Sequence, residues 1–295
     1  MKVAVIGGDK RMLFAARAFL NDGCEVSVSG FDNIMSMCDI RIMEIPDAVK
    51  WADIAVLPVR PVSDGCLSAP YSAERTDISQ LVGMIGDRPI FTGCSGQIEP
   101  YALGEVFDYA AREDFTYRNA ELTAEATMGI ILNDYEGSVF GSRALVLGYG
   151  RIGKLLSAYL KAMGAEVTVA ARGLSDRSLA ALGGLDAVGY GNITYGEYDL
   201  IFNTVPAAVV SGDDIDKMRE DVFIVDLAST PGGVDFKAAE RRGLSCMHAL
   251  SLPGKTAPLS AGVIIKDTIF SIIKEVNGGK DKTGLRYDGL LLHFG

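Results

Sequence analysis

Short apolar runs alternate along the chain with longer stretches in which apolar residues recur at helical spacing. Each apolar run is four to six residues long and is followed by turn-forming residues. These runs lie at 3–6, 54–57, 89–92, 144–147, 166–171, 200–203 and 222–226. Runs of this kind are typical of strands buried on both faces of a parallel sheet. Their alternation with helical stretches predicts an α/β protein.

A glycine-rich turn joins the strand at 144–147 to a helical stretch at 154–163. The turn reads GYGRIG over residues 148–153, and a second strand follows at 166–171. GxGxxG between a strand and a helix, with another strand after it, is the context of a dinucleotide-binding turn. An ordinary βαβ unit that happens to be rich in glycine does not explain three glycines at this spacing.

Each glycine of this turn has a physical task in such a site. Gly148 would make the tight turn, Gly150 would let the backbone approach a pyrophosphate, and Gly153 would let the helix pack closely. The phosphates would bind main-chain N–H groups at the positive end of the helix, where Arg151 and Ile152 stand. We therefore expect all five residues to bind the cofactor.

The residue that ends the second strand distinguishes NAD from NADP. An NAD site places Asp or Glu there to accept a hydrogen bond from the ribose 2′-hydroxyl. Here that position is Ala171, and Arg172 follows. A guanidinium suits a 2′-phosphate, to which Ser175 and Arg177 would add further donors. The sequence therefore predicts NADP as the cofactor; the alternative is that Arg172 is a solvated surface residue.

Composition limits the remaining classes of function. A chain of 295 residues is long enough for two domains, and a net charge of −10 argues against nucleic acid or an anionic membrane as partner. No apolar run is long enough to span a membrane, and the N-terminus has no signal peptide. Five cysteines without a CxxC pair indicate a reduced, cytoplasmic chain, and two histidines make a histidine-rich metal site unlikely, so no metal is expected. These residues are Cys24, Cys38, Cys66, Cys94, Cys246, His248 and His293.

The two halves of the chain resemble each other. Residues 3–31 align without gaps on residues 144–172, and the same strand–turn–helix–turn–strand unit is present in both. In the first copy Asp9 replaces the second glycine and Met12 replaces the third. A carboxylate there would repel a pyrophosphate, so this copy is expected to hold substrate instead, with Arg11 as a carboxylate receptor. The alternatives are a plain helix N-cap for Asp9 and a surface position for Arg11.

These patterns predict two Rossmann-like, doubly wound parallel-sheet domains with an interdomain cleft. The stretch from Leu259 to Glu275 has apolar residues at helical spacing and, as the last helix, would return to the first domain. The expected boundaries are 1–122 for the substrate domain, completed by the helix at 259–276, then 123–258 for the NADP domain and 277–295 for a tail.

Turns after the strands should border the cleft, because ligands bind at the carboxyl ends of parallel strands. In the first domain one such turn holds Cys94, interpreted as a small buried residue, and Ser95, a candidate donor to substrate. In the second domain two turns would pass beside the nicotinamide and its ribose. Their candidate cofactor ligands are Thr204, Val205, Pro206, Ala228 and Ser229.

Several motifs in this order resemble one family, the A subunit of dipicolinate synthase of sporulating bacteria. The resemblance runs to about residue 276, and two cations of the family pattern are missing, since Thr230 and Leu259 stand in their places. The motifs are GGDKR at 7–11, NAELTAE at 119–125, the glycine-rich turn with Ala171-Arg172, NTVP at 203–206, DLASTPGGVD at 226–235 and LPGKTAP at 252–258.

The resemblance implies oxidation of dihydrodipicolinate to dipicolinate, with NADP as hydride acceptor. It also implies a partner, a flavoprotein-like B subunit, and a homo-oligomer is expected as well. Glu125 is the candidate base and Lys255, in a loop, a candidate catalytic donor; Asn119 and Thr123 would join Ser95 in binding the carboxylates. The alternatives are a first-turn acid for Glu125, stabilised by the helix dipole, and a solvated lysine for Lys255.

Two other functions stay open. A 2-hydroxyacid dehydrogenase of the same architecture needs a histidine before the final helix, and residues 255–262 contain none, while His248 lies too early. A cofactor-binding regulatory subunit, inactive without its partner, is the second alternative.

Overall fold

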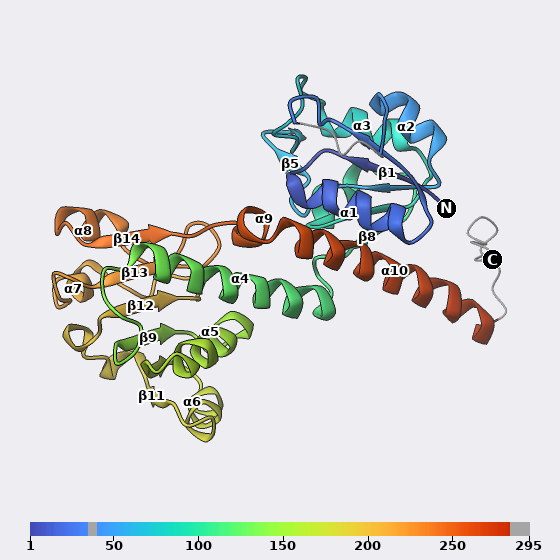
Figure 1. The fold of residues 1–295 in the computed structure, drawn as a ribbon. Helices are drawn as coiled ribbons and strands as arrows, with labels where there is room; N and C mark the ends of the chain where they lie inside the picture. The colour runs from blue at the N-terminus through green and yellow to red at the C-terminus, as the bar shows by residue number, and fades with distance from the viewer. Residues whose placement is uncertain (35–39, 284–295) are drawn as a thin grey trace. The chain divides into compact units, whose positions relative to one another are not determined.

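The computed structural model describes residues 1–34 and 40–283, which form two compact units (Figure 1). Of the described residues, the first unit contains those in 1–119 and 257–283, and the second contains residues 120–256. Each unit has its own six-stranded sheet, in which all neighbouring strands are parallel. The prediction of two doubly wound parallel-sheet domains is confirmed.

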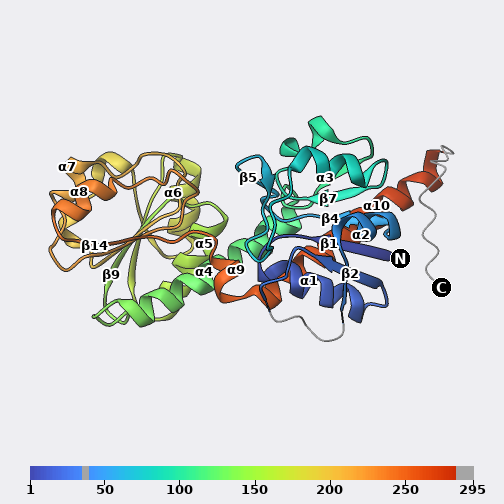
Figure 2. The same ribbon diagram turned by 90° about the horizontal axis from the view of Figure 1, so that it is seen from above.

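The first sheet is built around β1 (Lys2–Ile6), in the strand order β3-β2-β1-β4-β7-β8. Helices α1 and α10 cover one face of the sheet, and α2 and α3 cover the other (Figures 1 and 2). Alternate residues of a strand point to opposite faces, so Ala4 and Ile6 pack beneath α2 and α3. The remaining elements are β2 (Glu25–Ser29), β3 (Arg41–Ile42), β4 (Ile54–Val56), β7 (Ile90–Thr92), β8 (Val106–Asp108), α1 (Lys10–Asn21), α2 (Ile45–Trp51), α3 (Ile78–Ile85) and α10 (Pro258–Thr283).

The last helix, α10, packs along α1 within this unit (Figure 1). Gly262 makes the close approach possible, because a Cβ there would lie 2.5 Å from the main-chain nitrogen of Ala15. Further along, the rings of Phe19 and Phe270 meet edge to face at 5.4 Å. The predicted final helix is therefore present, but it continues to Thr283 instead of giving way to a tail at residue 277; the rest of that predicted tail, 284–295, lies outside the described residues.

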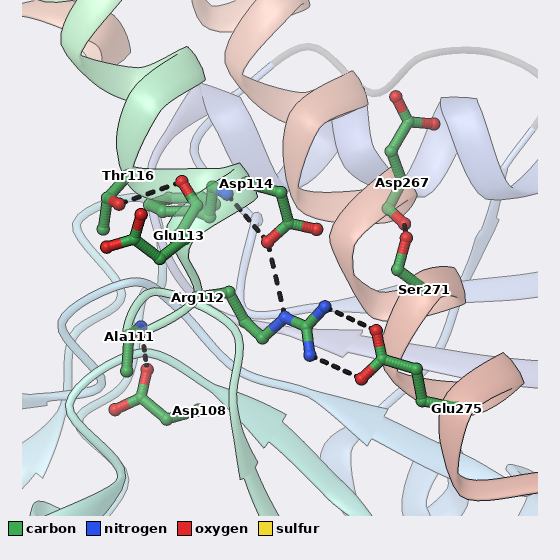
Figure 3. A network of polar contacts seen from close by, with 10 residues as sticks. Asp108, Ala111, Arg112, Glu113, Asp114, Thr116, Asp267, Ser271 and Glu275 are labelled. Atoms are coloured by element: carbon green, nitrogen blue, oxygen red, sulfur yellow. Dashed lines mark hydrogen bonds and ion pairs between the residues drawn. The ribbon is translucent and has the colours of Figure 1, made fainter. Parts of the chain in front are cut away.

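A polar contact holds the second half of α10 (Figure 3). The Arg112 guanidinium donates to both carboxylate oxygens of Glu275, at 2.6 and 2.7 Å, and also approaches Asp114. This hydrogen bond lowers the pKa of Glu275 below its usual range. These two parallel hydrogen bonds fix how α10 is oriented against the residue that precedes α4 (Glu113–Asp134).

A second group of charges lies earlier on α10. The Lys266 ammonium, on a largely buried side chain, pairs with Asp267 at 2.7 Å and with Asp22 at the end of α1. Asp267 also accepts a hydrogen bond from Arg118 at 2.9 Å. Burial alone would raise the pKa of Asp267, but the hydrogen bonds from Lys266 and Arg118 outweigh it and lower that pKa.

The second sheet repeats the arrangement of the first around β9 (Arg143–Leu147), in the order β11-β10-β9-β12-β13-β14. One face packs against α4 and α5, and the other against α7 and α8. The remaining elements of this unit are β10 (Glu166–Ala170), β11 (Asp186–Val188), β12 (Leu200–Asn203), β13 (Phe223–Asp226), β14 (Ser245–His248), α5 (Arg151–Ala162), α6 (Leu174–Leu182), α7 (Gly212–Ile215), α8 (Phe236–Arg241) and α9 (Leu252–Thr256).

The internal repeat read from the sequence is present in the structure. Lys2 pairs with Glu25 in the first sheet as Arg143 pairs with Glu166 in the second, at the same offset along the chain. The turns after the two helices also correspond, since the φ angles are +84° at Gly23 and +86° at Gly164.

In the first unit, a segment at 66–73 covers the turn after β1. It begins in the short hairpin of β5 (Val62–Ser63) and β6 (Cys66–Leu67). Ser68 accepts a hydrogen bond from the Gly8 N–H at 2.8 Å, and a Cβ on Gly7 would meet Leu67 at 2.8 Å. Asp32, just past the end of β2, accepts the N–H of Ala73 at 3.0 Å. The main chain of the turn after β1 is therefore engaged by the protein's own segment, whereas a cavity of about 540 Å³ lies past the end of β2, lined by Gly30, Asp32 and the stretches at 42–46 and 72–76 among others.

Among the residues that the structure describes, no helix has the length and apolar character needed to cross a membrane. Within the same residues, no cluster of three or more His, Cys, Asp or Glu side chains is arranged to hold a metal ion.

Candidate functional site

A cavity of about 380 Å³ lies at the carboxyl ends of β9, β10 and β12 in the second unit. Three turns bound it, at 148–150, 171–173 and 204–206, and the side chains of Asp176 and Tyr190 complete the wall. This is the edge at which doubly wound sheets bind their ligands, beside the point where the strand order reverses. Six of the predicted cofactor residues, Gly148, Gly150, Arg172, Thr204, Val205 and Pro206, come together here.

The three glycines of the turn have distinct surroundings. Gly148 has a φ of +93°, and a Cβ on it would lie 2.6 Å from Thr204 Oγ1 and 2.8 Å from Val205 Cγ2. A Cβ on Gly153 would lie 2.3 Å from the carbonyl oxygen of Gly148. At Gly150 no atom of residues 1–34 or 40–283 lies within 4 Å of where a Cβ would be, apart from its chain neighbours. Two glycines are thus required by the protein's own packing, whereas Gly150 leaves open space at the mouth of the cavity.

The start of α5 is suited to an anion. Its N-cap is Gly150, and among the described residues no side chain caps the helix. The matching helix of the first unit, α1, is capped by the carboxylate of Asp9, which accepts the Arg11 N–H at 3.0 Å. Main-chain N–H groups at a helix start attract phosphate. The helix behind Gly150, opened by Arg151 and Ile152, therefore offers a phosphate the position that Asp9 occupies in the first unit.

The rim of the cavity beyond β10 carries Arg172, which is exposed. Arg177 does not reach into the cavity as a spare donor, because its Nη1 donates to the carbonyl oxygens of Ala171 and Arg172 at 2.8 and 2.7 Å. Ser175, in the first turn of α6, is exposed and does not line the cavity. Arg177 thus braces the turn that presents Arg172.

Sequence reasoning missed three residues of the wall, Tyr149, Asp176 and Tyr190. Asp176 stands in the first turn of α6, five positions after Ala171, where the rule for NAD sites does not look for an acid. Burial raises the pKa of Tyr190, and the positive charge of Arg172 opposes that rise. Tyr149 is the second residue of the glycine-rich turn, a position that the GxGxxG pattern leaves open to any residue, so the sequence did not mark it as a cofactor residue.

The other predicted cofactor residues do not line the cavity. Ala228 is buried, and Ser229 is exposed, in the turn after β13. Thr204, in the wall itself, donates its hydroxyl to the carbonyl oxygen of Leu147 at 2.8 Å, so its side chain is engaged within the protein.

In the first unit the predicted substrate residues are Arg11 and Ser95. The Arg11 guanidinium binds Asp9 with two parallel hydrogen bonds of 2.9 and 2.7 Å, so the N-cap reading of Asp9 is confirmed and a substrate carboxylate would have to share Arg11 with it. Ser95 donates its hydroxyl to Glu99 at 2.6 Å. Cys94 was expected to be buried, which is wrong: it is exposed, with φ +51°, because the turn after β7 points its side chain outward.

The remaining candidates belong to helices. Asn119 and Thr123 lie in α4, the first half-buried and the second buried. Glu125 is exposed in the middle of α4, so the reading of it as a first-turn acid is wrong: α4 begins at Glu113, well before it. Lys255 was expected in a loop, which is wrong: it is exposed in the short helix α9.

Comparison with known proteins places the chain in a family. A family model for the N-terminal domain of the dipicolinate synthase A subunit matches residues 2–100. The A subunit of dipicolinate synthase from Bacillus subtilis (strain 168) is 30% identical over 297 residues, covering 96% of this chain and 99% of the relative. The chain belongs to the family of dipicolinate synthase A subunits.

Solved members of the family have the same fold. The crystal structure of the dipicolinate synthase A subunit from Bacillus halodurans matches with a TM-score of 0.82 and 28% identity, covering 92% of this chain and 97% of that one. The crystal structure of the A chain from Bacillus subtilis also matches with a TM-score of 0.82 and 28% identity, over 95% and 97% of the two chains. A Sinorhizobium meliloti transhydrogenase, with a TM-score of 0.70 at 14% identity over 92% and 94% of the two chains, shares the fold alone.

Proposed function

We propose that this protein is an oxidoreductase that oxidises dihydrodipicolinate to dipicolinate with NADP. The observation that carries the cofactor assignment is the cavity in the second unit, with the uncapped helix α5 behind Gly150 and the exposed Arg172 on its rim. Membership of the family of dipicolinate synthase A subunits supports the substrate.

The residues of the cavity fit the parts of a dinucleotide. The pyrophosphate would lie on the N–H groups at the start of α5, where Gly150 leaves room. Arg172 would bind the 2′-phosphate of NADP, and Tyr190, whose ring stands near that charge, would contact the adenosine. The turn at 204–206 would contact the ribose and nicotinamide, and Ala228 and Ser229 follow the neighbouring strand β13.

The reaction needs little covalent chemistry from the protein. When bound, NADP supplies the hydride acceptor, and the substrate gains an aromatic ring as it loses a hydride and a proton. The chain must orient a dicarboxylate and accept that proton. Glu125 is the candidate base, and Lys255, Arg11, Ser95, Asn119 and Thr123 are candidate partners of the carboxylates. A flavoprotein-like B subunit is the expected partner, and the cytoplasm the expected compartment.

A 2-hydroxyacid dehydrogenase activity is less well supported. Its proton transfer would need a histidine before α10, and the chain has none between residues 249 and 257. His248, at the end of β14, places its Nε2 2.9 Å from the carbonyl oxygen of Ala228 and stacks on Phe236. Its ring is thus engaged by its own unit.

The test is to mix the purified chain and NADP with dihydrodipicolinate or, in parallel, with a 2-hydroxy acid, with and without a B subunit, and to follow NADPH absorbance. NADPH binding is measured on the same samples by fluorescence titration. We expect the wild-type chain to form NADPH and the Gly150→Asp variant to form none. Turnover of a 2-hydroxy acid instead would favour the dehydrogenase alternative. NADPH binding without turnover, even with the B subunit, would refute the catalytic proposal and leave the chain with a regulatory, cofactor-binding role.

A further inference from the structure

Two buried polar side chains end neighbouring strands of the second sheet. Asn203 is the last residue of β12 and Asp226 the last residue of β13, and they are partners in the parallel register. Both are fully buried, with 0% exposure. Asn203 Nδ2 donates to Asp226 Oδ1 at 2.8 Å. A buried carboxylate is costly unless its oxygens are satisfied, so where its other hydrogen bonds go matters.

The Asp226 carboxylate binds both ends of the loop that follows β13. Oδ1 accepts the Ala228 N–H at 2.9 Å, and Oδ2 accepts the Gly233 N–H at 2.7 Å. Together with Asn203, it therefore accepts three N–H donors. A Cβ on Gly232 would lie 2.7 Å from Oδ2, so the loop passes closely over the carboxylate.

Asn203 fixes the neighbouring turn in the same way. Its Oδ1 accepts the Val205 N–H at 3.0 Å, and its Nδ2 donates to the Val205 carbonyl at 3.1 Å. Val205 in turn lines the cavity, and its Cγ2 lies 2.8 Å from where a Cβ on Gly148 would be. A continuous set of contacts thus runs from the Asp226 carboxylate through Asn203 to the glycine-rich turn.

We infer that Asp226 is a positioning residue of the cofactor site, acting through Asn203 and the main chain of the two turns at 204–206 and 228–233. The inference rests on the proposed function, because it assigns a role in holding the nicotinamide half of NADP. An ionised carboxylate suits the task, because it offers only acceptors and has enough lone pairs for all three N–H groups. Those donors orient the turns without Asp226 touching the ligand itself.

The decisive variant is Asp226→Asn, which keeps the size of the side chain. Its single oxygen can serve Asn203 and Ala228, but its NH₂ group then faces the N–H of Gly233, so one end of the loop is released. The double variant Asn203→Asp with Asp226→Asn restores a donor–acceptor pair between the side chains. Position 226 still has one acceptor oxygen for the two N–H groups of the loop, and position 203 no longer donates to the Val205 carbonyl.

The matched control is Asp199→Asn. Asp199 accepts the Arg143 N–H at 2.8 Å at the opposite, amino edge of the same sheet. Its loss should affect folding stability without moving the turns around the cavity.

The assay compares two probes by fluorescence and calorimetric titration: NADPH, and adenosine 2′,5′-bisphosphate, which has only the adenosine half. For Asp226→Asn we expect NADPH binding to weaken about tenfold, the effect of one lost hydrogen bond to a charged group. The double variant, which also loses the hydrogen bond to the Val205 carbonyl, should weaken NADPH binding by at least as much. Binding of the bisphosphate, at the Arg172 rim, should stay within about twofold of wild type, since that rim lies on other turns. Asp199→Asn should bind both probes normally.

Three results would overturn the inference. Equal weakening of both probes would mean that Asp226 is needed only for the fold, and unchanged NADPH binding would mean that the carboxylate does not position the turns. Recovery of wild-type affinity in the double variant would show that the side-chain pair alone matters. Failure of the wild-type chain to bind NADPH at all is a different result, and it would refute the proposed function itself.

Discussion

Replacing Gly150 by aspartate should abolish dinucleotide binding while leaving the fold intact or slightly more stable. Gly150 has φ −77° and ψ −162°, close to the −89° and −170° of Asp9 at the matching position of the first unit. Those angles suit any residue, and nothing lies within 4 Å of the new Cβ. The new carboxylate can therefore cap α5 as Asp9 caps α1.

The two effects have opposite signs and different sizes. A carboxylate about 4 Å from a phosphate charge costs about 4 kcal/mol at an effective dielectric constant of about 20, or about a thousandfold in affinity. In the first unit Arg11 neutralises Asp9, whereas Ile152 stands at the equivalent position of the second unit, so the charge would not be compensated. The cap and the lost glycine flexibility should together stabilise the unit by about 1 kcal/mol, raising Tm by about 3 °C.

The assay is NADPH titration by fluorescence, together with thermal unfolding of the same samples. Gly150→Asn is the matched control, because it has the size of aspartate and its capping ability but no charge, and it should lose much less affinity. If Gly150→Asp binds NADPH within about tenfold of wild type, the phosphates do not lie at the start of α5. If it unfolds, the equivalence of the two turns is wrong.

Three further outcomes follow from the structure. Arg172→Ser should weaken NADP binding by about 1.5–3 kcal/mol and leave NAD binding unchanged, as measured by titration with both; an equal loss for both would remove Arg172 from the 2′-phosphate site. In α10, Gly262→Val should destabilise the chain by about 2 kcal/mol or more in chemical unfolding, whereas Gly278→Ala, with open space around it, should stabilise it by up to about 1 kcal/mol; similar effects would contradict the close approach at Gly262. The pKa of Asp267 is lowered in the folded chain, so the ionised carboxylate stabilises the fold above about pH 4, and this stabilisation is lost as pH falls through the lowered pKa. Asp267→Asn should therefore lower the free energy of unfolding by under about 1 kcal/mol at neutral pH and by little in acid. A difference in unfolding free energy that does not change with pH would refute this linkage.

The buried strands were readable from the sequence, whereas the edge strands were not. Strands β1, β4, β9 and β12 are buried on both faces, which produces the continuous apolar runs. At the sheet edges, both residues of β3 are exposed and the residues of β8 and β11 are at most half-buried, so no apolar run marks them. Burial on both faces, more than strand propensity, made the fold predictable.

The site was predictable where the backbone imposes the residue type. Gly148 and Gly153 have no alternative at their positions, and their spacing is visible in the sequence. Asp176 and Tyr190 reach the cavity only because α6 and the chain after β11 bring them there, which no local pattern encodes. The errors at Cys94 and Lys255 have the same origin, because a turn's direction and a one-turn helix depend on tertiary packing.

The segment at 66–73 affects which molecules can reach the turn after β1. Because it is part of the same chain as the turn after β1 that it covers, its effective local concentration there is at least on the order of millimolar, and a dissolved competitor must exceed that to displace it. A dissolved nucleotide would therefore have to displace this segment before it could reach the main chain of that turn. On the proposed function the chain would therefore hold one coenzyme, in its second unit, although its sequence contains the strand–turn–helix motif twice.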